Sequence, residues 1–82
     1  MQEFEVKVNT VEKVKNFVIL NSQQKFDIDM ISGKYIIDAK SIMGLFSLDC
    51  SKFIKVLAHS ENTPEYREYL NKVKSFCEVK EN

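Results

Sequence analysis

Polar and apolar positions alternate at the start of the chain. Residues 3–8 read EFEVKV, and this period of two predicts a strand with one buried face. Asn9 or Thr10 then offers a side-chain oxygen as a helix N-cap, and Glu12 stands where a capping-box partner of Asn9 would lie. Apolar residues recur at three- and four-residue spacing after the cap. We therefore expect a helix over residues 11–23.

The period of two returns in residues 26–30, FDIDM, which predicts a second strand with its aspartates in water. Gly33 follows and supplies the positive φ that a tight hairpin turn usually needs. A third strand over residues 34–39 completes the hairpin. Ser41 can then cap a short helix over residues 42–48.

Gly44 lies in the middle of that short helix, where glycine costs about 1 kcal/mol relative to alanine. Its presence indicates close packing or an approaching partner at that point. A fourth strand is expected over residues 53–59, and both of its faces are apolar, so it should be central or covered.

The clearest periodicity lies near the end of the chain. Thr63 as N-cap, Pro64 at the first helical position and Glu65 in the first turn predict a helix start. One apolar stripe at helical spacing follows, comprising Tyr66, Tyr69, Leu70, Val73, Phe76 and Cys77. We expect a helix of about three turns there.

The predicted order of elements defines the fold class. Short strands of this kind cannot stand alone, so we expect an α+β open-faced β-sandwich, with a four-stranded sheet and three helices on one face in the order βαββαβα. The length predicts a single domain over residues 1–82. The chain has no apolar run of the roughly 18 residues that a membrane helix needs and no signal-peptide pattern, so we expect a cytoplasmic protein without a membrane partner.

Charge and cysteine content narrow the function classes. Twelve Lys and Arg residues balance twelve Asp and Glu residues, which argues against nucleic acid as a direct partner. Cys50 and Cys77 are the only cysteines and form no CxxC motif. Two reduced thiols, buried or half-buried, are therefore expected rather than a disulfide or a zinc site.

Candidate catalytic chemistry is sparse. His59 is the only histidine, and no HxxxH pattern or neighbouring cysteine accompanies it, so we expect a surface residue rather than a metal ligand. The carboxylate pairs Asp27–Asp29 and Glu78–Glu81 lie on an exposed strand face and in a polar tail, where charges serve solubility. Glycine-rich phosphate loops and GxSxG motifs do not occur in the sequence. We therefore expect no enzyme, no metal and no cofactor.

Residues 40–48, KSIMGLFSL, hold more large apolar side chains than a helix of under two turns can bury. Those that face solvent, beside Ser41 at the cap, would make a docking patch for a protein partner. The alternative is that these residues simply pack under the sheet.

Residues 40–44, KSIMG, and residues 46–48, FSL, closely resemble a segment of HPr, the phosphocarrier of the bacterial sugar phosphotransferase system. The order of strands and helices also resembles that of the HPr fold over essentially the whole chain. The resemblance implies that protein partners dock at Lys40, Ile42, Met43 and Phe46, with Phe17 on the first helix extending the patch.

HPr proteins carry a phosphorylatable histidine in a G-[IL]-H-A-R-P stretch at the start of the first helix. In this chain the corresponding residues 9–15 read NTVEKVK, without His, Arg or Pro. A relay needs an imidazole nitrogen that attacks a phosphoryl group, and Glu12, near the position of that histidine, would repel phosphate. We therefore expect no phosphate relay through the usual site.

Ser41 matches the serine that HPr kinase phosphorylates in many Gram-positive members of the family. A phosphate there adds about −2 charge beside helix amides that favour an anion. The resemblance is closest in logic to catabolite-repression HPr-like proteins, which lack the histidine, keep the serine and bind a transcription regulator. It implies a non-enzymatic regulator of carbon metabolism whose partner is an HPr kinase or a transcription regulator, with a plain helix cap as the alternative role of Ser41.

Two other functions stay open. The chain could act as an atypical phosphocarrier in sugar uptake, using His59 or Glu12. It could also be a ferredoxin-like module that binds RNA or a metabolite. Neutral charge and the lack of an RNP-type aromatic strand motif argue against RNA.

Overall fold

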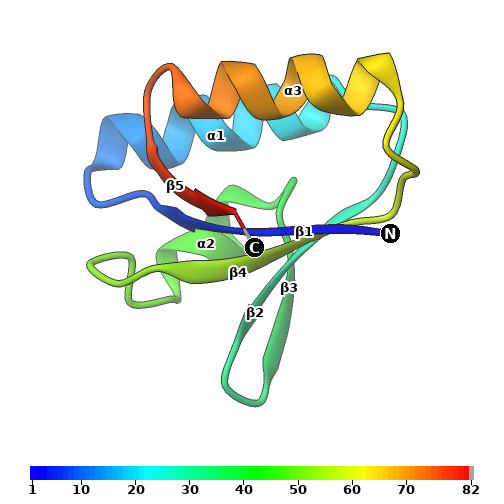
Figure 1. Cartoon of the computed structure of the whole chain (residues 1–82). Coiled ribbons are helices and arrows are strands. Elements are labelled where there is room, and N and C mark those ends of the chain that lie inside the picture. Colours follow the sequence, from blue (N-terminus) through cyan, green and yellow to red (C-terminus); the bar gives the residue numbers. More distant parts are fainter. Residues whose placement is uncertain (82) are drawn as a thin grey trace.

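A computed structural model describes residues 1–81, in which one sheet is covered by helices on one side (Figure 1). The elements in chain order are β1 (Gln2–Lys7), α1 (Val11–Ser22), β2 (Ile28–Ser32), β3 (Tyr35–Asp38), α2 (Ile42–Phe46), β4 (Ile54–Ala58), α3 (Pro64–Lys74) and β5 (Glu78–Glu81).

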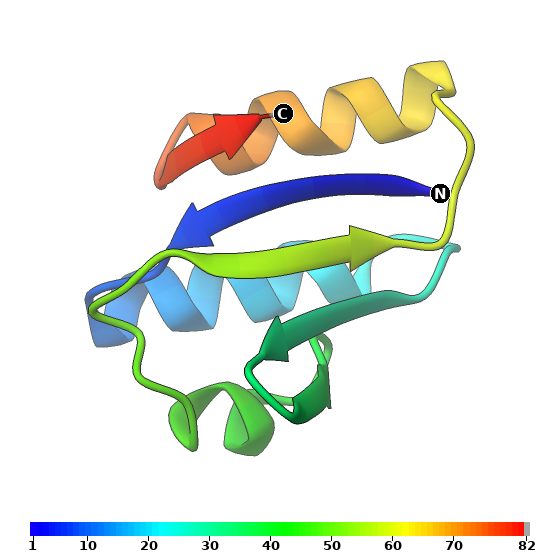
Figure 2. The ribbon, with the colours of Figure 1, turned by 60° about the horizontal axis from the view of Figure 1, so that its bottom comes forward.

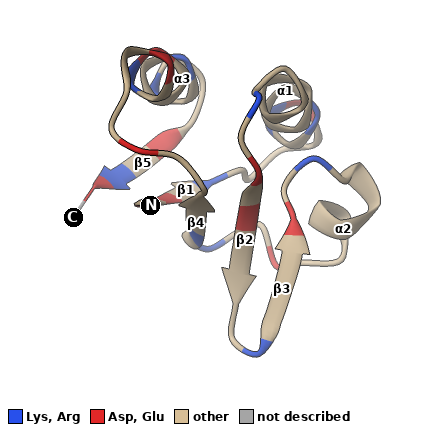
Figure 3. Cartoon of the chain, turned by 90° about the vertical axis from the view of Figure 1, so that its right-hand side faces the viewer, with Lys and Arg blue, Asp and Glu red and all other residues tan. Residues whose placement is uncertain are grey.

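The sheet has the strand order β3-β2-β4-β1-β5, and every strand pair is antiparallel (Figure 2). The fourth strand is central, as its two apolar faces predicted. Helices α1 and α3 lie over one face, and α2 lies beside β3, in contact with both β3 and α1 (Figure 3). The other face of the sheet is not covered by any element within residues 1–81.

The prediction of four strands is wrong, because β5 adds a fifth at the outer side of β1. Its alternating charges made this segment resemble a polar tail. Only Val79, which pairs with Val6, packs against the core. A charged strand is typical of a sheet edge, where charges discourage pairing with other chains. The pairing with β1 bridges residues far apart in sequence, so no local periodicity reveals it.

The predicted helices form, with corrected ends. Helix α3 begins at Pro64 behind the Thr63 cap, but it ends at Lys74, so Phe76 and Cys77 follow the helix instead of continuing its stripe. Helix α2 ends at Phe46, two residues earlier than expected.

The N-cap of α1 is Thr10, whose Oγ1 accepts a hydrogen bond of 3.1 Å from the Lys13 backbone N–H. The capping box between Asn9 and Glu12 does not form. The Asn9 side-chain oxygen instead accepts from Lys13 Nζ at 3.2 Å. Because the helix begins one residue later than that box requires, Glu12 stands in the first turn without the box geometry.

The hydrophobic core fills the space between the sheet and the helices. Its largest apolar members, with at most 1% of their surface exposed, include Phe4, Phe17, Met30, Leu45 and Tyr69. Both predicted glycine roles are confirmed. Gly33 has a φ of +59° in the hairpin turn, and a Cβ at Gly44 would collide with Cγ2 of Ile37. Helix α2 therefore packs directly on the inner side of β3.

No helix within residues 1–81 is long and apolar enough to cross a bilayer.

Candidate functional site

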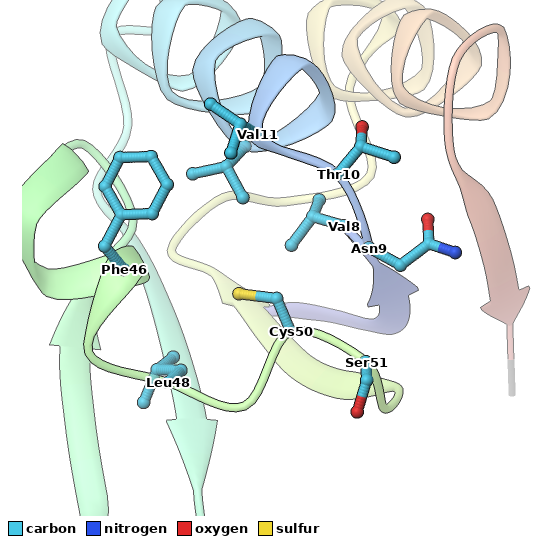
Figure 4. Close-up of a pocket in the computed structure, with 9 residues that line it drawn as sticks. Val8, Asn9, Thr10, Val11, Phe46, Leu48, Cys50 and Ser51 are labelled. Atoms are coloured by element: carbon cyan, nitrogen blue, oxygen red, sulfur yellow. The ribbon is translucent and has the colours of Figure 1, made fainter.

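A pocket of about 230 Å³ opens between the start of α1, the end of α2 and the loop before β4 (Figure 4). We call it the α1–α2 groove, and its lining residues are Val8, Asn9, Thr10, Val11, Val14, Phe46, Leu48, Cys50 and Ser51. Most of these side chains are apolar, and the polar ones come from the two loops that bound the groove. Such a lining suits an apolar group with a few polar contacts around it.

The Cys50 thiol points into the groove (Figure 4). Burial, and secondarily the negative charge of Asp49, raise the pKa of this thiol. Its Sγ also lies 3.4 Å from the Leu45 carbonyl oxygen, to which it donates a weak hydrogen bond. Cys50 therefore stays a protonated thiol at neutral pH and is a poor nucleophile.

Helix α2 divides the predicted docking residues between solvent and core. Met43 is 77% exposed and Phe46 is 45% exposed, and Phe46 also lines the groove. Ile42 is partly buried and packs against the core. Leu45 is fully buried. The helix is therefore one-sided: it buries Leu45 and presents Met43 and Phe46 to solvent.

Phe17 is no part of an accessible patch, because none of its surface is exposed. It lies with Val14 and Val18 on the inner face of α1, where spacings of three and four residues direct side chains to the sheet. Val11 takes the exposed position next to the groove instead. No feature of the sequence indicates that Val11 is exposed, because its spacing from Val14 and Val18 matches that of the buried apolar stripe of α1.

Lys40 is tied to the body of the protein. Its Nζ donates to the Gln24 carbonyl oxygen at 3.1 Å, and its backbone N–H donates to Asp38 Oδ1 at 2.9 Å. The first bond fastens the turn between β3 and α2 to the segment just after α1, and the second holds the turn itself.

Ser41 is exposed and caps α2 as predicted. Its Oγ accepts the Gly44 backbone N–H at 3.2 Å, and its own N–H donates to the Asp38 carbonyl at 3.0 Å. The hydroxyl is therefore both a cap and open to solvent.

A buried polar network holds the same turn from inside. Asn21 is fully buried, its Nδ2 donates to the Ala39 carbonyl at 2.9 Å, and its Oδ1 accepts from the Tyr69 hydroxyl at 2.6 Å. Burial strongly raises the pKa of Tyr69, so the hydroxyl keeps its proton. The network joins α1, α3 and the approach to Ser41. One feature of the sequence indicates this network: Asn21 follows Val14 by seven residues, so it falls on the inner, buried face of α1.

His59 lies at the surface, as expected, but it has a partner. Its Nε2 is 2.7 Å from Asp29 Oδ2, and both side chains are partly exposed. Because β1 and β4 are antiparallel and Gln2 pairs with Ala58, His59 lies beside the start of β1. Helix α1 begins after the other end of β1, so the imidazole and the groove occupy opposite ends of the sheet. No cluster of three or more potential metal ligands occurs within residues 1–81.

The fold is similar to that in the crystal structure of HPr-C-His from Thermoanaerobacter tengcongensis. The TM-score is 0.72, and the similarity covers 92% of this chain and 93% of that chain, at 23% sequence identity. No protein-family model and no curated protein sequence matches this chain. The structural similarity confirms an HPr-like α+β fold.

Proposed function

We propose that this HPr-like chain is a non-enzymatic regulator that binds a protein partner through the α2 surface, defined as Ser41, Met43, Phe46 and Val11. Phosphorylation of Ser41 switches that binding. The observation that carries the proposal is an exposed hydroxyl two residues from a highly exposed methionine on a helix that itself contains no charged residue.

The α2 surface has the composition of a docking site. Methionine adapts to differently shaped partners, and an exposed phenylalanine offers a large area that a partner can bury. Soluble proteins rarely leave such side chains clustered in solvent without a use. The adjacent α1–α2 groove would receive an apolar side chain of the partner.

Ser41 is suited to act as the switch. A phosphate would bring about −2 charge to an uncharged helix and would lie beside the backbone N–H groups of its first turn. The partner would then meet an anion next to Met43, so a partner with an arginine or lysine at that point would bind more tightly. The resemblance to HPr favours an HPr kinase as the enzyme that modifies Ser41 and a transcription regulator as the partner.

Incubation with ATP and an HPr kinase, followed by mass spectrometry, tests the switch. We expect one added phosphate on the wild type and none on Ser41→Ala. Ser47→Ala is the matched control, because Ser47 is an exposed serine at the other end of the same helix and its loss should leave the modification intact. An unmodified wild type rejects the switch.

A second function, phosphate relay, is favoured by the hydrogen bond between His59 and Asp29. A carboxylate that holds one imidazole nitrogen orients the other for attack, as in many nucleophilic sites. Phosphoenolpyruvate and the first enzyme of the phosphotransferase system provide the test. An acid-labile phosphate that His59→Ala abolishes would replace the regulator by a phosphocarrier, and we expect none.

A further inference from the structure

The two outer strands of the sheet differ in how they are protected. Strand β5 exposes Glu78, Lys80 and Glu81, and such charges deter pairing with another chain. Strand β3 instead exposes Tyr35 and Ile36, at 69% and 70% of their surface. An apolar strand at an open edge is a ready template for a further strand.

The backbone of β3 points the groups that such pairing needs outward. The Ala39 N–H donates to the Ile28 carbonyl at 2.8 Å, so Ala39 and Ile28 form a hydrogen-bonded pair of the antiparallel ladder. These pairs alternate along the ladder, so the pair of Ile36 and Ile31 is a non-hydrogen-bonded one. The N–H and C=O of Ile36 therefore point away from β2.

The edge is also accessible in the fold. The β2–β3 hairpin projects beyond the rest of the sheet, and α2 lies beside β3 only near its Asp38 end (Figures 1 and 3). Asp38 at the end of this strand and Lys34 in the turn before it are both exposed. None of the residues that line the α1–α2 groove belongs to β3.

We propose that two copies of this chain associate by antiparallel pairing of their β3 strands about a two-fold axis at Ile36. The pairing joins the two Ile36 residues by backbone hydrogen bonds and extends two five-stranded sheets into one. It also sets Lys34 of each copy opposite Asp38 of the other.

The charges beside β3 indicate that the strand added at this edge comes from a second copy of the chain. Ile36 and Asp38 share one face of the strand, because alternate residues point to the same side, and Lys34 lies in the hairpin turn directly before the strand. In the paired dimer, the two Ile36 residues lie at the centre, and at each end Lys34 from the turn of one copy lies opposite Asp38 of the other. Opposite charges placed across a strand pair stabilise sheets. The Lys40 N–H already orients the Asp38 carboxylate through Oδ1, and a carboxylate accepts further hydrogen bonds at its second oxygen.

Sedimentation equilibrium over a concentration series tests the proposal. A single strand pair is a small interface, so the series should reach about 1 mM protein. The weight-average mass should rise from 9.6 kDa towards twice that value. Lys34→Glu and Asp38→Lys each set like charges opposite one another and should each lower the association constant at least about tenfold.

An equimolar mixture of Lys34→Glu and Asp38→Lys supplies the decisive measurement. In the mixed dimer the introduced carboxylate of one copy faces the introduced ammonium of the other, so association should return to the wild-type level. A mass of 9.6 kDa at every concentration overturns the proposal, and so does association that these substitutions leave unchanged.

A second pair of variants covers the case in which Asp38→Lys fails to fold, since Asp38 also holds the turn before α2. Ile36→Asp should abolish the dimer, whereas Ile19→Asp, which changes an exposed isoleucine on α1, should leave it intact. Circular dichroism checks that each variant is folded. Equal losses from both variants would mean general hydrophobic association and would reject the β3 pairing.

Discussion

The two ends of the sheet carry different chemistry. At the groove end, α1 begins and α2 finishes around apolar side chains and a protonated thiol. At the opposite end, which we call the His59 end, an imidazole and a carboxylate meet in solvent. Apolar side-chain packing is the main interaction at the groove end, and solvent-exposed polar contacts are the main interaction at the His59 end. The apolar groove and the chain's single imidazole therefore lie at opposite ends of the same sheet.

The largest effect expected from this comparison is at Leu45, the fully buried residue of α2. Leu45→Ala should lower the free energy of unfolding by about 3 kcal/mol, because it removes buried methyl groups and leaves a cavity between α2 and the core. Urea denaturation measures the loss. Phe46→Ala is the control on the same helix and should cost under about 1.5 kcal/mol, since Phe46 is half in solvent. Equal losses would mean that α2 is not packed one-sidedly.

The second prediction concerns alkaline pH. Burial is the main cause that raises the pKa of the Cys77 thiol from 9.0 to about 11, while Lys13 opposes the shift. The unfolded thiol therefore ionises at a lower pH than the folded one, and stability should fall as pH rises from about 9 towards 11. Urea midpoints across this range measure the decline. Cys77→Ala should make the decline in stability shallower. Part of the decline should remain, because burial also raises the pKa of Tyr69.

The third prediction addresses the Asn21 network. Tyr69→Phe leaves the buried Asn21 Oδ1 without its donor and should cost about 1–2 kcal/mol of unfolding free energy. Tyr66→Phe, a buried neighbour on α3, should cost less because its hydroxyl does not bond to Asn21. Combining Tyr69→Phe with Asn21→Leu should cost less than the two single losses added together. Strict additivity would show that the two side chains do not act as one network.

Local pattern predicted most of the fold because each signal acts within a few residues. Thr63 and Pro64 started a helix, Gly33 made a turn, and Gly44 marked a close approach to β3. Strand β5 and the pairing of His59 with Asp29 escaped because both depend on residues that meet only through the sheet.

The candidate site shows the same limit. The sequence placed Ser41, Met43 and Phe46 correctly on the outside, since a five-residue helix cannot bury all its apolar side chains. It placed Phe17 there wrongly, although Phe17 stands three residues after Val14 on the apolar stripe that packs against the sheet.

The smallest effect is expected at the His59 end. The pair of His59 and Asp29 is partly exposed, and exposed ion pairs contribute little because solvent screens them. A double-mutant cycle of His59→Gln and Asp29→Asn, measured by urea denaturation, should give a coupling under about 1 kcal/mol. Added salt should reduce it further when the imidazole is protonated. A coupling free energy larger than the cost of Tyr69→Phe would contradict the view that the His59 end holds only weak, solvent-exposed contacts. A polar contact of that strength is typical of functional sites and would favour phosphate relay through His59.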